Sequence, residues 1–225
     1  MTAQILHGDC LDVMRTLEKN SVDAVITDPP YGVNYVNKRH DIKPHKQFAK
    51  AIDNDDTQDV GQRVIDYCRS VGVPVCAFAH HRHPWRGDWR QHLVWDKGPC
   101  VGGGGDRATC WKFTWELIQV AGFGALNGKR ESAVLKHYVS QADYKYHPTQ
   151  KPLSLMRYLI EKLTRPGDLV FDPFCGSGST GVACVELDRR FIGVELNPEY
   201  AAIARQRIAA ARAETPLFAE AEGTR

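Results

Sequence analysis

An apolar segment that runs directly into a glycine-rich stretch constrains the fold of this chain more than any other feature. Residues 169–171 have the composition of a fully buried strand, and residues 172–181 read Asp-Pro-Phe-Cys-Gly-Ser-Gly-Ser-Thr-Gly. A helical stretch follows, and then a second strand, residues 191–195, which ends in a glutamate. A strand, a glycine-rich turn, a helix and a strand with an acidic end form half of a Rossmann-type nucleotide site. The pattern therefore predicts an α/β fold with a largely parallel sheet.

The glycine-rich turn leaves more than one interpretation open. Glycines let the backbone approach a ligand closely, and the N-terminus of the next helix offers N–H groups to an anion. Glu195 stands seventeen residues beyond Gly178 and could accept hydrogen bonds from both hydroxyls of a ribose. Gly176, Gly178 and Gly181 also satisfy the G-x-G-x-x-G pattern of an NAD enzyme, whereas the lack of a following Gly-Lys-Ser/Thr excludes a P-loop. A helix cap with no ligand is the purely structural alternative.

A second buried strand ends abruptly at two prolines. Residues 23–27 read Asp-Ala-Val-Ile-Thr and lead into Asp28-Pro29-Pro30-Tyr31. Proline cannot donate a hydrogen bond to a sheet, and it disfavours helix for the residue before it. Asp28 and Tyr31 are therefore expected at the carboxyl end of a strand, the edge where open α/β sheets bind ligands. A rigid turn that merely carries a polar residue is the alternative.

The beginning of the chain predicts a neighbouring strand with another carboxylate at the same edge. A short apolar strand at residues 5–6 ends near Asp9, and an amphipathic helix over residues 10–20 leads to the strand before Asp28. A strand–helix–strand unit ordinarily gives a parallel pair with a right-handed crossover. Asp9 and Asp28 are then expected at one edge of the sheet, although Asp9 also suits the N-cap of its helix.

The remaining apolar patterns predict further elements of a single domain. We expect strands at residues 73–79, 91–97 and 132–139, and helices over residues 58–70, from the stretch at 148–152, and from 198 onward. Residues 117, 118 and 121 lie at helical spacing, which predicts a helix there. Because no internal repeat or second core is evident, residues 1–213 are expected to form one domain and residues 214–225 a disordered tail.

Two polar segments, residues 32–56 and the loops within residues 80–147, are expected to be recognition loops. The net charge of +2 is too small to indicate a polyanionic ligand by itself, so any nucleic-acid surface must be local. The candidates for phosphate contacts are Lys38, Arg39, His83 and Arg86. An ordinary solvated surface is the alternative. The histidines and cysteines lack the close pairing of zinc sites, so no metal site is expected.

Cysteine usage and hydropathy bear on the compartment. Seven cysteines with no C-x-x-C pair favour reduced thiols and hence the cytoplasm. No apolar run approaches ~18 residues, and the first residues lack a charged-then-apolar leader, so we expect neither a membrane span nor a secretion signal.

Taken together, the two stretches at 28–31 and 171–178 resemble those of the amino-directed DNA methyltransferases. The order, with the catalytic tetrapeptide first and the cofactor loop last, resembles the β group of that family, a circular permutation of the usual methyltransferase order. Similar motifs stand at residues 7–10, 147–152 and 193–198, and more loosely at 93–97. The strong matches cover roughly residues 5–35 and 147–200.

The resemblance implies a three-layer, Rossmann-like methyltransferase fold whose mostly parallel, seven-stranded sheet contains one antiparallel strand. It implies S-adenosylmethionine as methyl donor, double-stranded DNA as substrate and often a homodimer. Such an enzyme would act in a bacterial cytoplasm, as part of a restriction–modification system or as a phage protein in its host. Because the segment between the motifs is short, sequence specificity must be read by loops or be relaxed.

The resemblance also implies roles for individual residues. Asp9, with Cys10 beside it, would hold the adenine amino group of the cofactor, and Glu195, with Leu196 beside it, would hold the ribose. Lys151 would lie near the carboxylate of the methionine moiety. The loop that lines the methionine end would comprise Asp172, Pro173, Phe174, Cys175, Gly176, Ser177, Gly178, Ser179 and Thr180.

The tetrapeptide suits methylation of an exocyclic amine, which is a poor nucleophile because its lone pair is delocalised into the ring. The Asp28 carboxylate and the Pro29 carbonyl could accept its N–H groups and free the lone pair, while Pro30 keeps the turn stiff. Tyr31 offers a face on which the base could stack. Because the target atom lies inside a duplex, the base must be flipped out. Among such amines, Asp28 at the head of the tetrapeptide favours the N6 of adenine.

Several other assignments are open from the residues. A cytosine-N4 methyltransferase is the nearest, although its tetrapeptide more often begins with Ser, so that Asp28 favours adenine. Pro99-Cys100 resembles the nucleophile dipeptide of cytosine-C5 methyltransferases, but that chemistry would leave the tetrapeptide unused. An NAD-dependent oxidoreductase and a non-catalytic DNA-binding relic are more remote. Intact Asp28, Tyr31 and glycines disfavour the relic.

Overall fold

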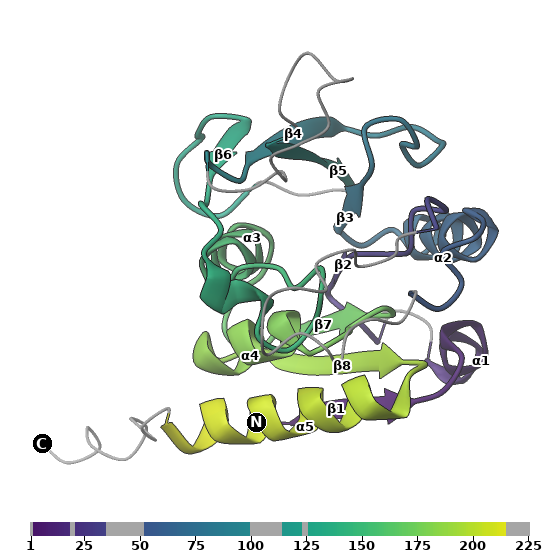
Figure 1. Cartoon of the computed structure of the whole chain (residues 1–225), viewed down its shortest axis with the longest axis vertical. Coiled ribbons are helices and arrows are strands. Elements are labelled where there is room, and N and C mark those ends of the chain that lie inside the picture. The colour runs from purple at the N-terminus through teal and green to yellow at the C-terminus, as the bar shows by residue number, and fades with distance from the viewer. Residues whose placement is uncertain (1, 19–20, 35–51, 100–113, 123–125, 215–225) are drawn as a thin grey trace, which may run out of the picture.

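A mixed β-sheet runs through the part of the chain that the computed structural model describes, residues 2–18, 21–34, 52–99, 114–122 and 126–214. Within these ranges the sheet has eight strands in the order β1-β8-β7-β2-β3-β5-β4-β6 (Figure 1). The strands are β1 (Ala3–His7), β2 (Ala24–Thr27), β3 (Val75–Ala79), β4 (Gln91–Asp96), β5 (Trp115–Ala121), β6 (Val134–Lys136), β7 (Leu169–Asp172) and β8 (Arg190–Glu195). The helices are α1 (Cys10–Thr16), α2 (Asp59–Ser70), α3 (Leu153–Leu163), α4 (Ser179–Glu186) and α5 (Pro198–Glu214), with a 3-10 helix η2 (Gln141–Tyr144).

The directions of the strands follow from their connections. Strands β1, β8, β7, β2 and β3 are mutually parallel, since a helix connects each to the next along the chain wherever they are sequential. Strand β5 is antiparallel to both of its neighbours, β3 and β4, and β6 is parallel to β4. The expectation of a mostly parallel sheet with one antiparallel strand is therefore confirmed.

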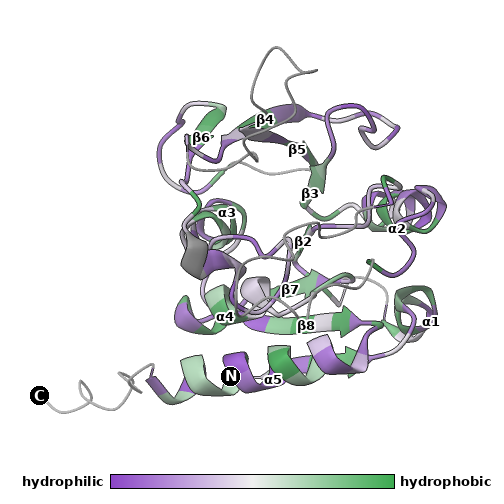
Figure 2. Ribbon diagram, in the orientation of Figure 1, coloured by the Kyte–Doolittle hydropathy of each residue, from purple (hydrophilic) through white to green (hydrophobic). Residues whose placement is uncertain are grey.

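The helices cover both faces of the sheet and make a three-layer arrangement (Figure 1). Alternate residues of β2 show the division, because Ile26 packs in a core with side chains of α3, α4 and α5, whereas Val25 packs with side chains of α1 and α2. All residues of β2, β3 and β7 are buried, as expected for parallel strands covered on both faces. Figure 2 accordingly shows hydrophobic colours on β3 and β7 and both colours on the outer helices.

The prediction of a helix around residues 117–121 was wrong, because this segment is strand β5. Ile118 and Gln119 are consecutive, so their side chains point to opposite faces of the sheet, and both are buried, which means that both faces are covered there. A strand buried on both faces loses the alternation of apolar and polar residues by which a strand is recognised. The seven segments predicted as strands all form strands, and β5 is the additional one that makes eight instead of the expected seven.

The start of one helix and the content of one predicted loop segment also differ from the prediction. Helix α3 begins at Leu153, after Pro152, so residues 147–151 are free of helix and turn toward the sheet edge. The segment 80–147 supplies three strands, β4, β5 and β6, besides its loops. The predicted tail lies, apart from residue 214, outside the described residues. In the described ranges, no helix is long and apolar enough to cross a membrane.

Candidate active site

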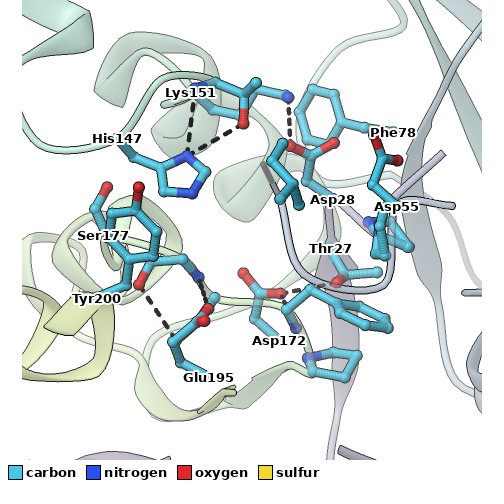
Figure 3. Close-up of a pocket in the computed structure, with 18 of the residues that line it drawn as sticks. Thr27, Asp28, Asp55, Phe78, His147, Lys151, Asp172, Ser177, Glu195 and Tyr200 are labelled. Carbon is cyan, nitrogen blue, oxygen red and sulfur yellow. Dashed lines mark hydrogen bonds and ion pairs between the residues drawn. The ribbon is translucent and has the colours of Figure 1, made fainter. Parts of the chain in front are cut away.

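A pocket of about 390 Å³ opens at the carboxyl edge of the parallel strands. Its lining comes from residues 8–10 after β1, 27–31 after β2, 172–177 after β7 and 195–196 after β8, with residues 147–151 on another side. The two site motifs meet because β2 and β7 are neighbours in the sheet. Thr27 Oγ1 donates a hydrogen bond of 2.8 Å to Asp172 Oδ1, although 145 positions separate them in the chain. Figure 3 shows these side chains converging on the pocket.

The glycine-rich turn depends on its glycines for backbone conformation and for packing. Gly176 and Gly178 have φ angles of +52° and +82°, in the left-handed region that favours glycine. A Cβ on Gly178 would lie 2.9 Å from the Cβ of Ala204 in α5, and one on Gly181 would lie 2.5 Å from Cδ1 of Ile208. The glycines therefore allow a tight turn over which α4 and α5 pack closely.

Asp172 holds this turn together from inside. Its Oδ2 accepts a 2.6 Å hydrogen bond from Thr180 Oγ1, and its Oδ1 accepts from Thr27 and from the Phe174 N–H at 3.1 Å. Burial raises the pKa of Asp172 to about 6, and the hydrogen bonds from the two threonines oppose that shift. The carboxylate thus joins β2, β7 and the start of α4.

The carboxylates at the ends of β8 and β1 are held by backbone N–H groups. Glu195 accepts from Gly176 N–H at 2.9 Å and from Asn197 N–H at 2.8 Å, while burial raises its pKa. Asp9 accepts from Leu11 N–H at 2.7 Å and is the N-cap of α1, as the helix-cap alternative predicts. Asp9 is nevertheless exposed and lines the pocket, so the cap does not exclude contact with a ligand.

His147 faces the pocket from the segment before α3 (Figure 3). Its Nδ1 lies 3.3 Å from the Thr149 N–H and can only accept there, which places the proton of the neutral ring on Nε2. Burial, together with the positive charges of Lys151 and Arg207, lowers the pKa of His147 to about 3. The ring is 4.4 Å from that of Tyr200, edge to face. His147 is therefore a neutral hydrogen-bond donor at neutral pH.

Asp28 lies in a cluster of ionisable groups at the other end of the pocket. Its Oδ1 accepts from Tyr31 Oη and its Oδ2 from Lys151 Nζ, both at 2.5 Å. Lys151 Nζ is also 3.4 Å from Glu116 Oε2, and the other oxygen of Glu116 pairs with Lys97. Burial raises the pKa of Asp28, and the positive charge of Lys151 opposes that shift. Burial would also raise the pKa of Glu116, but the positive charges of Lys151 and Lys97 outweigh it, so the pKa of Glu116 is lowered.

The pocket offers the hydrogen-bond acceptors and apolar walls that an S-adenosylmethionine molecule would need. Carboxylates on adjacent strand ends, Asp9 and Glu195, could accept from an adenine amino group and from ribose hydroxyls. A Cβ on Gly8 would meet nothing within 4 Å, so the backbone there leaves open space for a ligand. Phe174 and Leu196 add apolar walls. Within the described ranges, no group of three His, Cys, Asp or Glu side chains is arranged to hold a metal ion.

The predicted site residues fall into three groups in the structure. All four residues of the tetrapeptide line the pocket, as do Asp9, Cys10, Lys151, Asp172, Pro173, Phe174, Cys175, Gly176, Ser177, Ser179, Thr180, Glu195 and Leu196. Gly178, His83 and Arg86 do not line it, and Gly178 lies instead against α5. Lys38, Arg39 and Cys100 lie outside the described residues.

Sequence reasoning missed several residues that shape the pocket. Glu116 was missed because its strand was interpreted as a helix. Asp55 accepts from the Gly32 N–H at 2.9 Å and fixes the chain after the tetrapeptide, but only its place in a polar segment marks it in the sequence. Arg207 donates to the carbonyl of Ser177 at 2.6 Å, and its position late in α5 gives no local signal.

A family model, a sequence relative and solved structures all relate this chain to DNA methylases. Residues 88–206 match the family model described as DNA methylase. The putative methylase YubD of Escherichia coli K12 is 31% identical, over 92% of this chain and 91% of that protein. The M1.HpyAVI–SAM complex aligns with a TM-score of 0.65 and 26% identity, covering 92% of this chain and 100% of that one. The PvuII cytosine-N4-specific DNA methyltransferase, at 18% identity and covering 92% and 86% of the two chains, shares the fold with a TM-score of 0.68.

Proposed function

Because this chain belongs to the DNA methylase family of N6- and N4-directed enzymes, we propose that it methylates the exocyclic N6 of adenine at specific sites in double-stranded DNA. Its methyl donor is S-adenosylmethionine, and this sets the dinucleotide interpretation of the glycine pattern aside. The observation that supports the proposal most is the shared pocket, in which Asp28 and the glycine-rich turn face one another.

We assign the cofactor to the end of the pocket formed by β1, β8 and β7. Glu195 would accept from the ribose and Asp9 from the adenine amino group, with His147 Nε2 as a neutral donor nearby. The turn from Asp172 to Thr180 would surround the methionine moiety. When bound, S-adenosylmethionine supplies an electrophilic methyl group on a positively charged sulfur, and the acidic lining of the pocket suits that charge.

The tetrapeptide would prepare the target amine. Asp28 accepts an N–H most strongly when it is ionised, and its two oxygens keep free lone pairs beside the bonds from Tyr31 and Lys151. The Pro29 carbonyl would accept the second N–H. These two acceptors localise the lone pair of the nitrogen and orient it, which is catalysis by positioning and electrostatics without a covalent enzyme intermediate.

The target base would have to leave the duplex. The side chain of Asp28 is only 23% exposed, so a base that remains stacked in DNA cannot reach it. Tyr31 lies 6.1 Å from the ring of His80 and 6.4 Å from that of Trp85, measured between ring centroids. We propose that the extracted base stacks on the face of Tyr31.

The loop after β3 is a candidate for contacts with the DNA backbone. Gln119 accepts from the Trp85 N–H at 2.7 Å, and Gln62 accepts from the Arg86 N–H at 2.9 Å, so two side-chain amides fix the backbone of this loop. The side chain of Arg86 is exposed and would be presented to phosphates from a fixed base. The other cationic candidates are Lys38, Arg39 and His83.

The test is direct identification of the methylated nucleoside. Purified protein would be incubated with S-adenosylmethionine labelled in the methyl group and with unmethylated DNA, and the DNA would be digested and analysed by mass spectrometry. We expect label in N6-methyladenine, at a subset of adenines that sequencing then maps. Label in N4-methylcytosine would overturn the adenine assignment and support the cytosine-N4 alternative. Absence of label from DNA would overturn the activity.

A further inference from the structure

Four side chains of alternating charge form a chain of ion pairs behind the tetrapeptide, which we call the charge chain. It runs from Lys97 through Glu116 and Lys151 to Asp28. Lys97 follows β4, Glu116 belongs to β5, Lys151 precedes α3 and Asp28 follows β2, so four separate parts of the fold supply it. Figure 3 shows the last ion pair of the charge chain, in which Lys151 points at Asp28.

Lys151 is enclosed by its partners. Its side chain is 8% exposed, and its Nζ lies 2.5 Å from Asp28, 3.4 Å from Glu116 and 4.8 Å from the ring centroid of Phe78. An ammonium buried in this way is stable only if anionic partners compensate for its lost hydration. Two carboxylates and an aromatic face surround it, so the protein itself supplies that compensation.

The charges of the charge chain sum to zero, which argues against a further anionic partner for Lys151. Lys151 pairs with Asp28 and with one oxygen of Glu116, and Lys97 pairs with the other oxygen of Glu116. Lys151 therefore already has two carboxylate partners and does not need the carboxylate of a ligand to compensate its charge. These contacts favour a role for Lys151 at Asp28 over the role near the methionine carboxylate that the family resemblance implies.

We propose that Lys151 is a positioning residue for methyl transfer, which keeps Asp28 ionised and directs its carboxylate toward the target amine. Glu116 and Lys97 hold Lys151 in place. The inference rests on the proposed function, because it assigns Lys151 to the reaction at Asp28 and not to cofactor binding.

The groups around Asp28 determine the sign of the expected pH effect. Burial and the negative charge of Glu116 raise the pKa of Asp28, and the charge of Lys151 and the hydrogen bonds from Lys151 and Tyr31 lower it. Asp172 on β7 is a further nearby carboxylate, and burial raises its pKa as well. Lys151 is therefore the cation that opposes the protonation of Asp28, and its removal should raise the pKa of Asp28 further.

The test compares pH profiles of methyl transfer for Lys151→Met and the unaltered protein, under single-turnover conditions with unmethylated DNA. Methyl transfer needs ionised Asp28, so the rate falls on the acidic side as Asp28 takes up a proton. Loss of an opposite charge in direct contact should move this acidic limb to higher pH by about 1–3 units. The affinity for S-adenosylmethionine, measured by calorimetry, should change by less than about threefold, because the inference assigns Lys151 no direct contact with the cofactor.

Two further variants keep the inference testable if Lys151→Met does not fold. Lys151→Arg retains the charge and should retain the acidic limb, even if the rate is lower. Glu116→Gln removes the negative charge that raises the pKa of Asp28 but keeps an oxygen that can accept from Lys151, so the limb should move to lower pH. A matched control is Lys162→Met, which breaks the ion pair between Glu131 and a partly buried lysine in the last turn of α3, outside the pocket, and should leave the profile unchanged.

The outcomes separate this inference from the proposed function. If the unaltered protein transfers no methyl group to DNA, the proposed function fails before any variant is compared. If it is active and Lys151→Met lowers the rate equally at all pH values, Lys151 has a structural role and the inference is wrong. If Lys151→Met instead weakens S-adenosylmethionine binding tenfold or more with an unchanged limb, the lysine serves the cofactor and the inference is again wrong.

Discussion

The carboxylates at the two ends of the pocket are held in different ways. At the cofactor end, Glu195 and Asp9 accept from backbone N–H groups, and Asp172 accepts from hydroxyls and one N–H. At the catalytic end, Asp28 is held by the buried Lys151, and Glu116 by Lys151 and the partly buried Lys97. Both kinds of donor favour the ionised form of a carboxylate, but a cation adds a full opposite charge to the hydrogen bond and therefore opposes protonation more strongly.

This difference matches the work proposed for each end. A cofactor site needs acceptors at fixed positions, and a turn of the backbone supplies donors to fix them without additional buried charge. A catalytic carboxylate must in addition remain ionised in a dry site where burial favours its protonated form. A buried cation satisfies that second requirement. Variants at the two ends should therefore affect different quantities, and the following three are ordered from the largest effect to the smallest.

Asp28→Ala should have the largest effect and should act on catalysis alone. It removes the charged acceptor for the target amine, so methyl transfer should fall by about 10³-fold or more, as when a group that stabilises a transition state is deleted. Binding of S-adenosylmethionine should remain measurable by calorimetry, because the donors to Glu195 and Asp9 are unaffected. Rates from transfer of labelled methyl groups to DNA would measure the loss.

The control for this variant is Asp12→Ala, which removes an exposed aspartate of α1 that pairs with Arg15. Its rate should equal that of the unaltered protein. If Asp28→Ala retains turnover, the carboxylate is not part of the mechanism and the contrast between the two ends fails.

Glu195→Gln should have the next largest effect and should act on affinity. An amide has one acceptor oxygen, so either the Gly176 or the Asn197 N–H loses its partner. The neutral amide is also a weaker acceptor for the ribose than the carboxylate, so S-adenosylmethionine binding should weaken by about tenfold, while the rate at saturating cofactor changes little. Glu186→Gln, at a partly exposed glutamate that pairs with Arg157, is the matched control. A lower rate at saturating cofactor with unchanged affinity would contradict the assignment of Glu195 to cofactor binding.

How much of the site could be predicted from the sequence also differs between the two ends. The cofactor end consists of a turn and its flanking residues, so adjacent positions such as 172–180 contain almost all the information, and the positions predicted there line the pocket except for Gly178. The charge chain draws its four members from four parts of the fold. No spacing in the sequence links Glu116 to Lys151, and the strand that carries Glu116 was predicted as a helix because it is buried on both faces. Tertiary pairing of this kind is determined by strand order, which local periodicity does not contain.

Gly178→Ala should have the smallest effect and should act on stability, because Gly178 supports the cofactor turn without lining the pocket. The left-handed φ of +82° costs an alanine about 1–2 kcal/mol, and the added Cβ would lie 2.9 Å from that of Ala204. Gly72→Ala is the matched control, since its φ of +78° imposes the same backbone cost with no atom within 4 Å. Denaturant unfolding should show a larger loss of stability for Gly178→Ala, by about 1 kcal/mol or more of overpacking. Equal losses would mean that the contact with α5 does not restrain the turn, and that backbone conformation alone holds the cofactor end.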